Sequence, residues 1–223
     1  MTVRAVAWDV DGTLVDSEPL HHEALIAACR NWNVDISDIP EDMFRGVHMG
    51  NVWLAIAARM PASASERDWM KANDDFYVEH RRALKPMPGA IETVTALAAA
   101  GLRQICVSNA SRVLVDANVD ALGLAAFMEF TLSIDDVSHG KPEPEPYARG
   151  CGRLGLLPAQ VAAVEDSETG RRSADAAGLR VIAYDRLGGP VTHADHVVHD
   201  LTEIPVLLAA LRPATMPAGA SGA

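Results

Sequence analysis

The first hydrophobic run of the chain has the pattern of a buried strand. Residues 3–10, VRAVAWDV, are mostly apolar or β-branched, they end in acidic residues, and Gly12 follows. A short apolar run that stops at polar residues and a glycine is typical of a strand that opens into a loop. We therefore expect Asp9 and Asp11 at the carboxyl end of the first strand.

Between residues 19 and 84 the apolar positions take the spacing of helices. Prolines and glycines divide this stretch into three segments, HHEALIAACRNW, NVWLAIAARM and SERDWMKANDDFYVEHRRAL. Ser65, at the start of the third segment, is a common helix N-cap residue. Because no strand pattern interrupts the stretch, the sequence predicts a helical insertion after the first strand.

After residue 86, strand and helix patterns alternate. The expected strands are 102–108, 130–133, 161–165 and 180–184, and the expected helices are 90–100, 112–122, 146–154 and 170–177. Alternation of this kind predicts a parallel sheet with helices on both faces. We predict an α/β, Rossmann-like core of residues 1–15 and 87–211, a small α-helical cap of residues 16–86 inserted after the first strand, and a disordered Pro-, Ala- and Gly-rich tail of residues 212–223.

Polar residues cluster where three of these strands end. The clusters are Asp9 with Asp11, Ser108 with Asn109, and Glu165 with Asp166. In an open parallel sheet, ligands bind beyond the carboxyl ends of the strands. We therefore expect the three clusters to meet at one edge of the sheet.

Each cluster has a functional and a plain structural interpretation. Two close carboxylates are stable together with a cation or a shared proton, which suits metal-assisted phosphoryl transfer, but they also fit solvated loop acids. Ser108 and Asn109 can hold phosphate oxygens, or they can cap a helix. Lys141 precedes Pro142 in a stiff segment that can fix its ammonium toward a site, whereas most lysines are simply exposed. No single motif decides between these alternatives, but four in this order favour a site.

Charge and cysteine content narrow the function. The formal net charge of -11 argues against a nucleic-acid partner, and it means that binding an anionic phosphate requires a divalent cation or a local group of positive donors. The three cysteines, Cys29, Cys106 and Cys151, have neither the number nor the spacing of a disulfide framework or a zinc site. No apolar run reaches the roughly 18 residues needed to span a bilayer, so we expect a reduced, cytoplasmic protein without a membrane partner.

The motifs DVDGTLVDSE, VSNAS, GKPEPEPY and VEDSETG resemble those of the haloacid dehalogenase superfamily, over roughly residues 3–185. The resemblance implies that Asp9 is the nucleophile, which forms an aspartyl phosphate, and that Asp11 is the general acid and then the general base. It implies phosphate binding by Ser108 and Lys141, with Asn109 beside them. The Mg²⁺ ligands that it implies are Asp9, Asp11 through its backbone carbonyl, Asp166 and, as a further candidate, Glu165.

The acid at Asp11 separates two reaction classes within that superfamily. Dehalogenases resemble this chain but lack an acid at this position, because displacing a halide needs no proton on a leaving oxygen. The presence of Asp11 therefore favours phosphoryl transfer.

The helical insertion is similar to the small cap of the subgroup that contains phosphoglycolate phosphatases, β-phosphoglucomutases and sugar phosphatases. In that subgroup the cap closes over the substrate and excludes water. The candidate substrate contacts in the cap are Ser17, His21, Arg45, Gly46 and Lys71. Arg45 and Lys71 are candidates for binding a second anionic or hydroxylated group, although both also fit helix-surface charges, and His21 also fits a hinge-packing role.

The sequence thus predicts a Mg²⁺-dependent phosphatase that hydrolyses a sugar phosphate or sugar-acid phosphate through an aspartyl phosphate. One alternative is a phosphosugar mutase similar to β-phosphoglucomutase. Another is a phosphate-binding module without catalysis, against which the complete set of motif residues argues. The expected partner is a small phosphorylated metabolite, and the expected state is a monomer or a homodimer.

Overall fold

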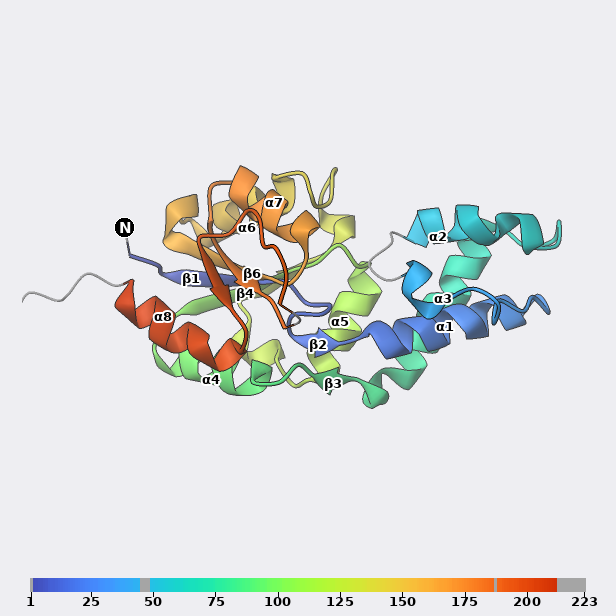
Figure 1. Cartoon of the computed structure of the whole chain (residues 1–223), viewed down its shortest axis with the longest axis horizontal. Coiled ribbons are helices and arrows are strands. Elements are labelled where there is room, and N and C mark those ends of the chain that lie inside the picture. The colour runs from blue at the N-terminus through green and yellow to red at the C-terminus, as the bar shows by residue number, and fades with distance from the viewer. Residues whose placement is uncertain (1, 45–48, 187, 212–223) are drawn as a thin grey trace, which may run out of the picture.

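A six-stranded parallel sheet forms the centre of the computed structural model, which describes residues 2–44, 49–186 and 188–211 (Figure 1). Its strands are β1 Ala5–Trp8, β4 Arg103–Val107, β5 Phe130–Leu132, β6 Val161–Glu165, β7 Arg180–Tyr184 and β8 His196–Val198. Their spatial order is β5-β4-β1-β6-β7-β8, and each neighbouring pair is parallel. The first strand of the chain therefore lies inside the sheet, where neighbours on both sides satisfy its backbone.

Helices cover both faces of the sheet. They are α4 Ala90–Ala99, α5 Arg112–Ala121 and α8 Ile204–Ala210 on one face, and α6 Glu145–Leu154 and α7 Glu168–Ala176 on the other (Figure 1). Because side chains alternate along β1, Val6 and Trp8 pack into the first layer and Ala5 and Ala7 into the second. This double coverage explains why the strand is apolar throughout.

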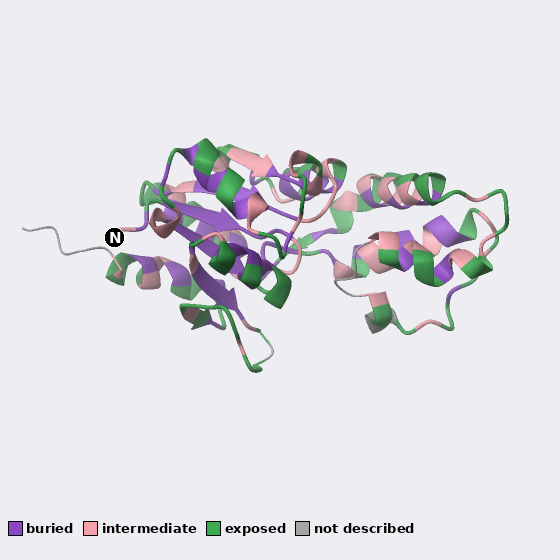
Figure 2. Ribbon diagram, turned by 90° about the horizontal axis from the view of Figure 1, so that it is seen from above, coloured by how far each residue is buried: buried purple, intermediate pink, exposed green. Residues whose placement is uncertain are grey.

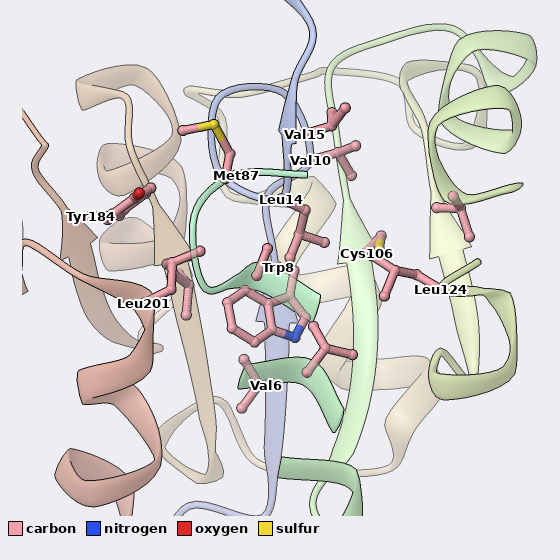
Figure 3. Close-up of a cluster of buried hydrophobic side chains, with 14 of the residues drawn as sticks. Val6, Trp8, Val10, Leu14, Val15, Met87, Cys106, Leu124, Tyr184 and Leu201 are labelled. Atoms are coloured by element: carbon pink, nitrogen blue, oxygen red, sulfur yellow. The ribbon is translucent and has the colours of Figure 1, made fainter. Parts of the chain in front are cut away.

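Trp8 is the largest side chain of the cluster in Figure 3 and is fully buried there. Its indole N–H donates to Gln104 Oε1 at 2.9 Å, and Gln104 Nε2 donates to the carbonyl of Val94 at 3.0 Å. These bonds give the buried polar groups partners, so the tryptophan fills the core without an unsatisfied donor.

A separate helical body follows the first strand. It contains α1 Glu18–Arg30, α2 Met49–Ile56 and α3 Glu66–His80, with 3₁₀ turns η1 Glu41–Phe44, η2 Ala57–Arg59 and η3 Arg81–Ala83. Buried positions lie inside this body, apart from those of the sheet (Figure 2). The body has its own buried apolar cluster, whose largest member is Trp69. Ser65 caps α3 as expected, since its hydroxyl accepts from the backbone N–H of Asp68 at 3.1 Å.

A short antiparallel pair joins the helical body to the sheet. Strand β2, Val15–Asp16, pairs with β3, Lys85–Pro86, where the chain leaves the core and where it returns. This pair lies close to the ends that we predict for the cap, residues 16 and 86. We keep the division into core and cap as a proposal, and use "cap" for the body of α1, α2 and α3.

The predicted fold class is confirmed, and the four strands predicted after residue 86 lie within about a residue of their observed ends. The sequence analysis missed the short pair β2 and β3, the edge strand β8 and helix α8. The remaining short turns are η4 Ala125–Phe127, η5 Ile134–Asp136, η6 Pro158–Gln160 and η7 Leu201–Glu203. The predicted disordered tail, 212–223, lies outside the described residues.

Within residues 2–44, 49–186 and 188–211, no helix is both long enough and apolar enough to cross a bilayer.

Candidate active site

Asp9 lies directly after β1, at the carboxyl edge of the sheet. Its backbone N–H donates to the carbonyl of Val164 on β6 at 3.0 Å, which continues the strand pairing by one residue. The residue is only 7% exposed. Burial raises the pKa of Asp9 well above its usual value, and the charges of Glu165 and Asp166 raise it further, against the opposing effect of Lys141.

Lys141 reaches the same place from the loop before α6. Its ammonium donates to Asp9 Oδ1 at 2.7 Å, to Glu165 Oε1 at 2.6 Å and to the carbonyl of Val107 at 2.8 Å. All three N–H donors therefore have partners. Burial alone would lower the pKa of Lys141, but the two carboxylates outweigh it and raise this pKa, so the ammonium stays charged.

Asn109 fixes the backbone on which Lys141 stands. Its Oδ1 accepts from the Lys141 N–H at 2.8 Å, and its Nδ2 donates to the Lys141 carbonyl at 3.0 Å. Asn109 also lines the cavity described below. A role in positioning Lys141 is thus visible in the contacts, beside the phosphate binding that we predict for this residue.

Glu165 is fully buried behind Lys141. The hydroxyl of Tyr147 donates to its Oε1, and the hydroxyl of Ser167 donates to its Oε2 at 3.2 Å. A Cβ at Gly170 would stand 1.9 Å from Oε2, so only glycine leaves room for this carboxylate. Glu165 is therefore a tightly enclosed partner of Lys141, with no open face toward the cavity.

Asp166 stands beside the turn that carries Asp11. Its Oδ1 accepts from the hydroxyl of Thr13 at 3.4 Å. Gly12 has a φ of 81°, and a Cβ there would stand 2.3 Å from Asp166 Oδ2, so this approach requires glycine for both reasons. Asp166 is an exposed residue, but the protein around its carboxyl group and the charge of Glu165 raise the pKa of Asp166 to about 7.

Three acids of this site could hold a metal ion. Oxygens of Asp9, Glu165 and Asp166 all lie within 4.8 Å of one another. Hard oxygen donors of this kind suit Mg²⁺, which keeps few protein carboxylates and completes its shell with water or substrate. Removal from water, followed by the charge of Glu165, raises the pKa values of Asp9 and Asp166, and a bound cation would favour the ionised form of both acids. The donor set therefore fits the predicted magnesium.

Asp11 points to the other side of the turn and makes different contacts. Its Oδ2 accepts from Ser108 Oγ at 3.3 Å and its Oδ1 accepts from Asn118 Nδ2 at 3.0 Å. His21 Nε2 is 3.5 Å from the same Oδ1. Burial works to raise the pKa of Asp11, but these neighbours, led by His21, prevail and lower it. Burial likewise opposes protonation of His21, yet the bond and charge of Asp11 raise its pKa.

A cavity of about 530 Å³ lies between the strand ends and the cap. Asp11, Asn109, Ser111, Asp135 and Lys141 line it from the core. The cap contributes apolar side chains and a few polar ones: Leu25, Phe44, Met49, Val52 and Met70, with Glu18, His21, His22 and Asp74. The cavity is large enough for a small metabolite, and Asp11 and Lys141 are part of its lining.

The cap candidates have different outcomes. His21 lines the cavity, and Ser17 is buried just before α1, where its hydroxyl has no hydrogen-bond partner within the described residues. Lys71 is exposed and pairs with Asp75 at 2.7 Å, away from the described lining. Arg45 and Gly46 lie outside the described residues.

Four residues near the acids escaped the sequence analysis as site residues. Thr13 lies in the motif DVDGTLVDSE and Tyr147 in the motif GKPEPEPY. Their places in these motifs could have identified them as site residues. Asn118 and Tyr77 belong to helical stretches with no motif of their own. Only the folded chain brings them together, since the Tyr77 hydroxyl donates to Asn118 Oδ1 at 2.7 Å.

With this geometry in place, comparison with known proteins gives a consistent result. The haloacid dehalogenase-like hydrolase family matches residues 3–178. Hexitol phosphatase A of Escherichia coli (strain K12) is 32% identical, over 92% of this chain and 95% of that protein. A plasmid phosphoglycolate phosphatase of Cupriavidus necator is 30% identical, over 93% and 94%. The crystal structure of CbbY from Rhodobacter sphaeroides in complex with phosphate aligns with a TM-score of 0.79 and 25% identity, over 91% and 96% of the two chains.

Proposed function

We infer the reaction from family membership: the chain belongs to the haloacid dehalogenase-like hydrolase family and is a phosphoric monoester hydrolase. We propose that it removes phosphate from a small sugar or polyol phosphate, through an aspartyl phosphate on Asp9 and with Mg²⁺ as cofactor. The observation that carries the proposal is the division of labour between the two aspartates. Asp9 contacts the buried ammonium and the acid cluster, whereas Asp11 turns toward Ser108, Asn118 and His21 and lines the cavity.

In the first step, a carboxylate oxygen of Asp9 attacks phosphorus and the bond from phosphorus to the leaving oxygen breaks. Lys141, held by Glu165, keeps a positive charge beside the transferring group, and Ser108 and Asn109 stand next to it. Asp9, Asp166 and the backbone carbonyl of Asp11 would hold Mg²⁺, which would supply further positive charge against the phosphate. Glu165 acts in this scheme by holding Lys141, because its oxygens are occupied by hydrogen bonds.

Asp11 moves the proton in both steps. Because its pKa is lowered, Asp11 must first take up a proton, and His21, whose Nε2 lies 3.5 Å away and whose pKa is raised, could supply it. Asp11 then gives this proton to the leaving alcohol in the first step and accepts one from the attacking water in the second. The water oxygen then bonds to phosphorus, the bond between phosphorus and Asp9 breaks, and inorganic phosphate leaves. The contact with Ser108 places Asp11 next to the phosphate site, where such a transfer requires it.

The cavity walls favour an uncharged leaving group. Asp74 and Asp135 bring negative charge to the described walls, and Lys141 is the one Lys or Arg side chain among the described lining residues. Its three donors already have protein partners. A carboxylate or a second phosphate on the substrate would meet repulsion there, whereas hydroxyl groups could donate to Asp74. We therefore favour a sugar or polyol phosphate over the sugar-acid phosphate that the sequence left open.

The same wall argues against the mutase alternative. A mutase passes through a bisphosphate and must hold a second phosphate at the far end of the cavity. The relatives also fit hydrolysis better than a mutase reaction, since two of them are named hexitol phosphatase A and validoxylamine A 7'-phosphate phosphatase.

Phosphate release from matched substrates tests the proposal. The central pair is sorbitol 6-phosphate and 6-phosphogluconate, because they differ at the far end by a hydroxymethyl against a carboxylate. We expect kcat/KM to be at least about tenfold higher for sorbitol 6-phosphate, and activity to vanish with a chelator and return with Mg²⁺. Preference for the acid would contradict the leaving-group assignment. Appearance of an isomeric sugar phosphate without free phosphate would instead establish the mutase.

A further inference from the structure

We propose that Asn118 is a positioning residue for Asp11, and that Tyr77 acts on the reaction through Asn118. This inference rests on the proposed role of Asp11 in moving a proton to and from the substrate. It concerns two residues that neither touch the phosphate site nor belong to the four sequence motifs.

The carboxylate of Asp11 is held at both ends. Asn118 Nδ2 donates to Oδ1 at 3.0 Å, and Ser108 Oγ donates to Oδ2 at 3.3 Å. With one donor on each oxygen, rotation of the carboxylate about its last bond would break two hydrogen bonds. Without Asn118, the remaining protein donors are Ser108 on one oxygen and the more distant His21, 3.5 Å from the other. Asn118 thus fixes the plane of the carboxyl group through which Asp11 takes up and gives away a proton.

The orientation of the Asn118 amide is itself determined by a second residue. The Tyr77 hydroxyl donates to Asn118 Oδ1 at 2.7 Å. Burial raises the pKa of Tyr77 far above its usual value, so the phenol keeps its proton as a donor. The amide oxygen therefore faces Tyr77, and the amide nitrogen must face Asp11.

The surroundings of Asn118 make its polarity costly. The residue is fully buried on α5, on the helix face that also buries Leu114, Val115 and Val119. An amide in such a place lowers stability unless every polar atom has a partner, and a leucine would fit the pattern of its neighbours. Both observed partners lie toward the site, so the contacts that compensate this cost are the ones that orient Asp11.

Tyr77 connects this arrangement to the cap. It lies on α3, and its ring packs against the ring of His21 from α1, with centroids 4.6 Å apart. Two helices of the cap therefore reach the same oxygen of Asp11, one through His21 and one through Tyr77 and Asn118. Asp11 is fully oriented only while α3 lies against α5, as it does here.

Three variants test the proposal: Asn118→Leu, Tyr77→Phe and the double variant. We expect Asn118→Leu to lower kcat by about 10- to 100-fold with KM within about threefold, because general acid–base catalysis contributes about 10²- to 10⁴-fold and only orientation is lost. Tyr77→Phe keeps the ring on His21 and should lower kcat by about three- to tenfold. If Tyr77 acts through Asn118, the double variant should match Asn118→Leu rather than multiply the two effects.

Rapid-mixing kinetics with para-nitrophenyl phosphate separate positioning from a merely structural role. The nitrophenolate leaving group needs no proton, so Asp9 should still be phosphorylated quickly in Asn118→Leu. The attacking water still needs Asp11 as a base, so hydrolysis of the aspartyl phosphate should slow. We therefore expect a burst of nitrophenolate, approaching one per active site, that is larger in the variant than in the parent enzyme.

The matched control is Gln104→Leu, which replaces another fully buried amide that contacts Trp8 and Val94 but no acid of the site. It should lower thermal stability and leave kcat per folded enzyme and the burst unchanged. An Asn118→Leu enzyme with parental kcat and parental burst would overturn the proposal. The proposal would also be overturned if the losses of kcat in the two single variants multiply in the double variant. If Asn118→Leu does not fold, an unchanged kcat in Tyr77→Phe would still overturn it. Failure of the parent enzyme to release phosphate from any substrate would instead refute the proposed function.

Discussion

The strand-end site and the cap wall face the same cavity, but they are built in different ways. On the core side, Asp9, Lys141 and Glu165 are less than 10% exposed and are joined by short charged hydrogen bonds. On the cap side, the lining is mostly apolar, and a charged pair such as Lys71 and Asp75 is exposed at the surface. The core side fixes charges for one reaction, whereas the cap side offers shape and a few polar contacts. Substitutions on the two sides should therefore have very different effects.

The largest effect should come from Asp9→Asn, which removes the nucleophile without changing its size. We expect kcat to fall by at least about 10⁴-fold, as for loss of other covalent catalysts. The fold should persist, because burial and the neighbouring acids already disfavour the charge of Asp9. Phosphate release and the circular dichroism spectrum measure the two expectations. Activity close to that of the parent enzyme would refute the assignment of Asp9 as the nucleophile. It would also contradict the expectation that core-side substitutions have much larger effects than cap-side ones.

Lys141→Met should show how much the core site depends on its ion pairs. It leaves Asp9 and Glu165 buried without a cation, which we expect to cost about 3–5 kcal/mol in the free energy of unfolding, with loss of activity. Without the Lys141 charge, which lowers the pKa of Asp9, the folded-state pKa of Asp9 should rise further, so the loss should grow as pH rises above about 4 and shrink at acid pH. Urea denaturation at several pH values measures this. An equal loss at every pH would indicate a packing defect instead.

Magnesium should stabilise the core in a pH-dependent way. In the metal-free protein the pKa of Asp166 is about 7 and that of Asp9 is raised above 3.8. Between about pH 4 and pH 7 the folded state therefore binds more protons than the unfolded state, and its stability should fall as pH rises across this interval. Bound Mg²⁺ prefers the ionised acids, and at about 100 times its dissociation constant it should add about 2.7 kcal/mol. Thermal unfolding should show a larger Mg²⁺ effect at about pH 8 than at about pH 5.5; equal effects would contradict the assignment.

The smallest effect should come from Lys71→Ala on the cap. Its exposed pair with Asp75 is four residues apart on α3, and such pairs contribute only a few tenths of a kcal/mol. We expect kcat/KM to stay within about twofold for every substrate, since the side chain does not line the described cavity. A large loss of kcat/KM for one substrate only would show that Lys71 binds that substrate, and would extend the binding site along α3.

The sequence predicted the core well for a physical reason. Strands buried on both faces leave continuous apolar runs, and β6 and β7 were predicted with their observed bounds, Val161–Glu165 and Arg180–Tyr184. The strand ends then had to be polar, which brought Asp9, Ser108 and Asp166 to one edge. Strand β8, His196–Val198, was not predicted because three residues are too few to show a strand pattern in the sequence.

The cap side was harder to predict because its contacts are set by packing between segments. Lys71 was named as a binding candidate, although its spacing from Asp75 already fitted a surface pair along one helix. Asn118 and Tyr77 could not have been paired from the sequence, since they are 41 residues apart and lie on helices that meet only in the folded chain. Specific side-chain contacts between distant helices leave no local signal.

The central place of β1 in the sheet also bears on how this chain reaches its native state. Ala5 pairs with Arg103 on one side and with Val161 on the other, so β1 is synthesised well before the two strands with which it pairs. Contacts so distant in sequence slow folding, and an apolar strand with two open edges is prone to aggregation while it waits. The helical insertion, which has its own apolar cluster, can order locally during that interval. Expression yield should therefore respond to chaperone supply and temperature more than to changes in the active site.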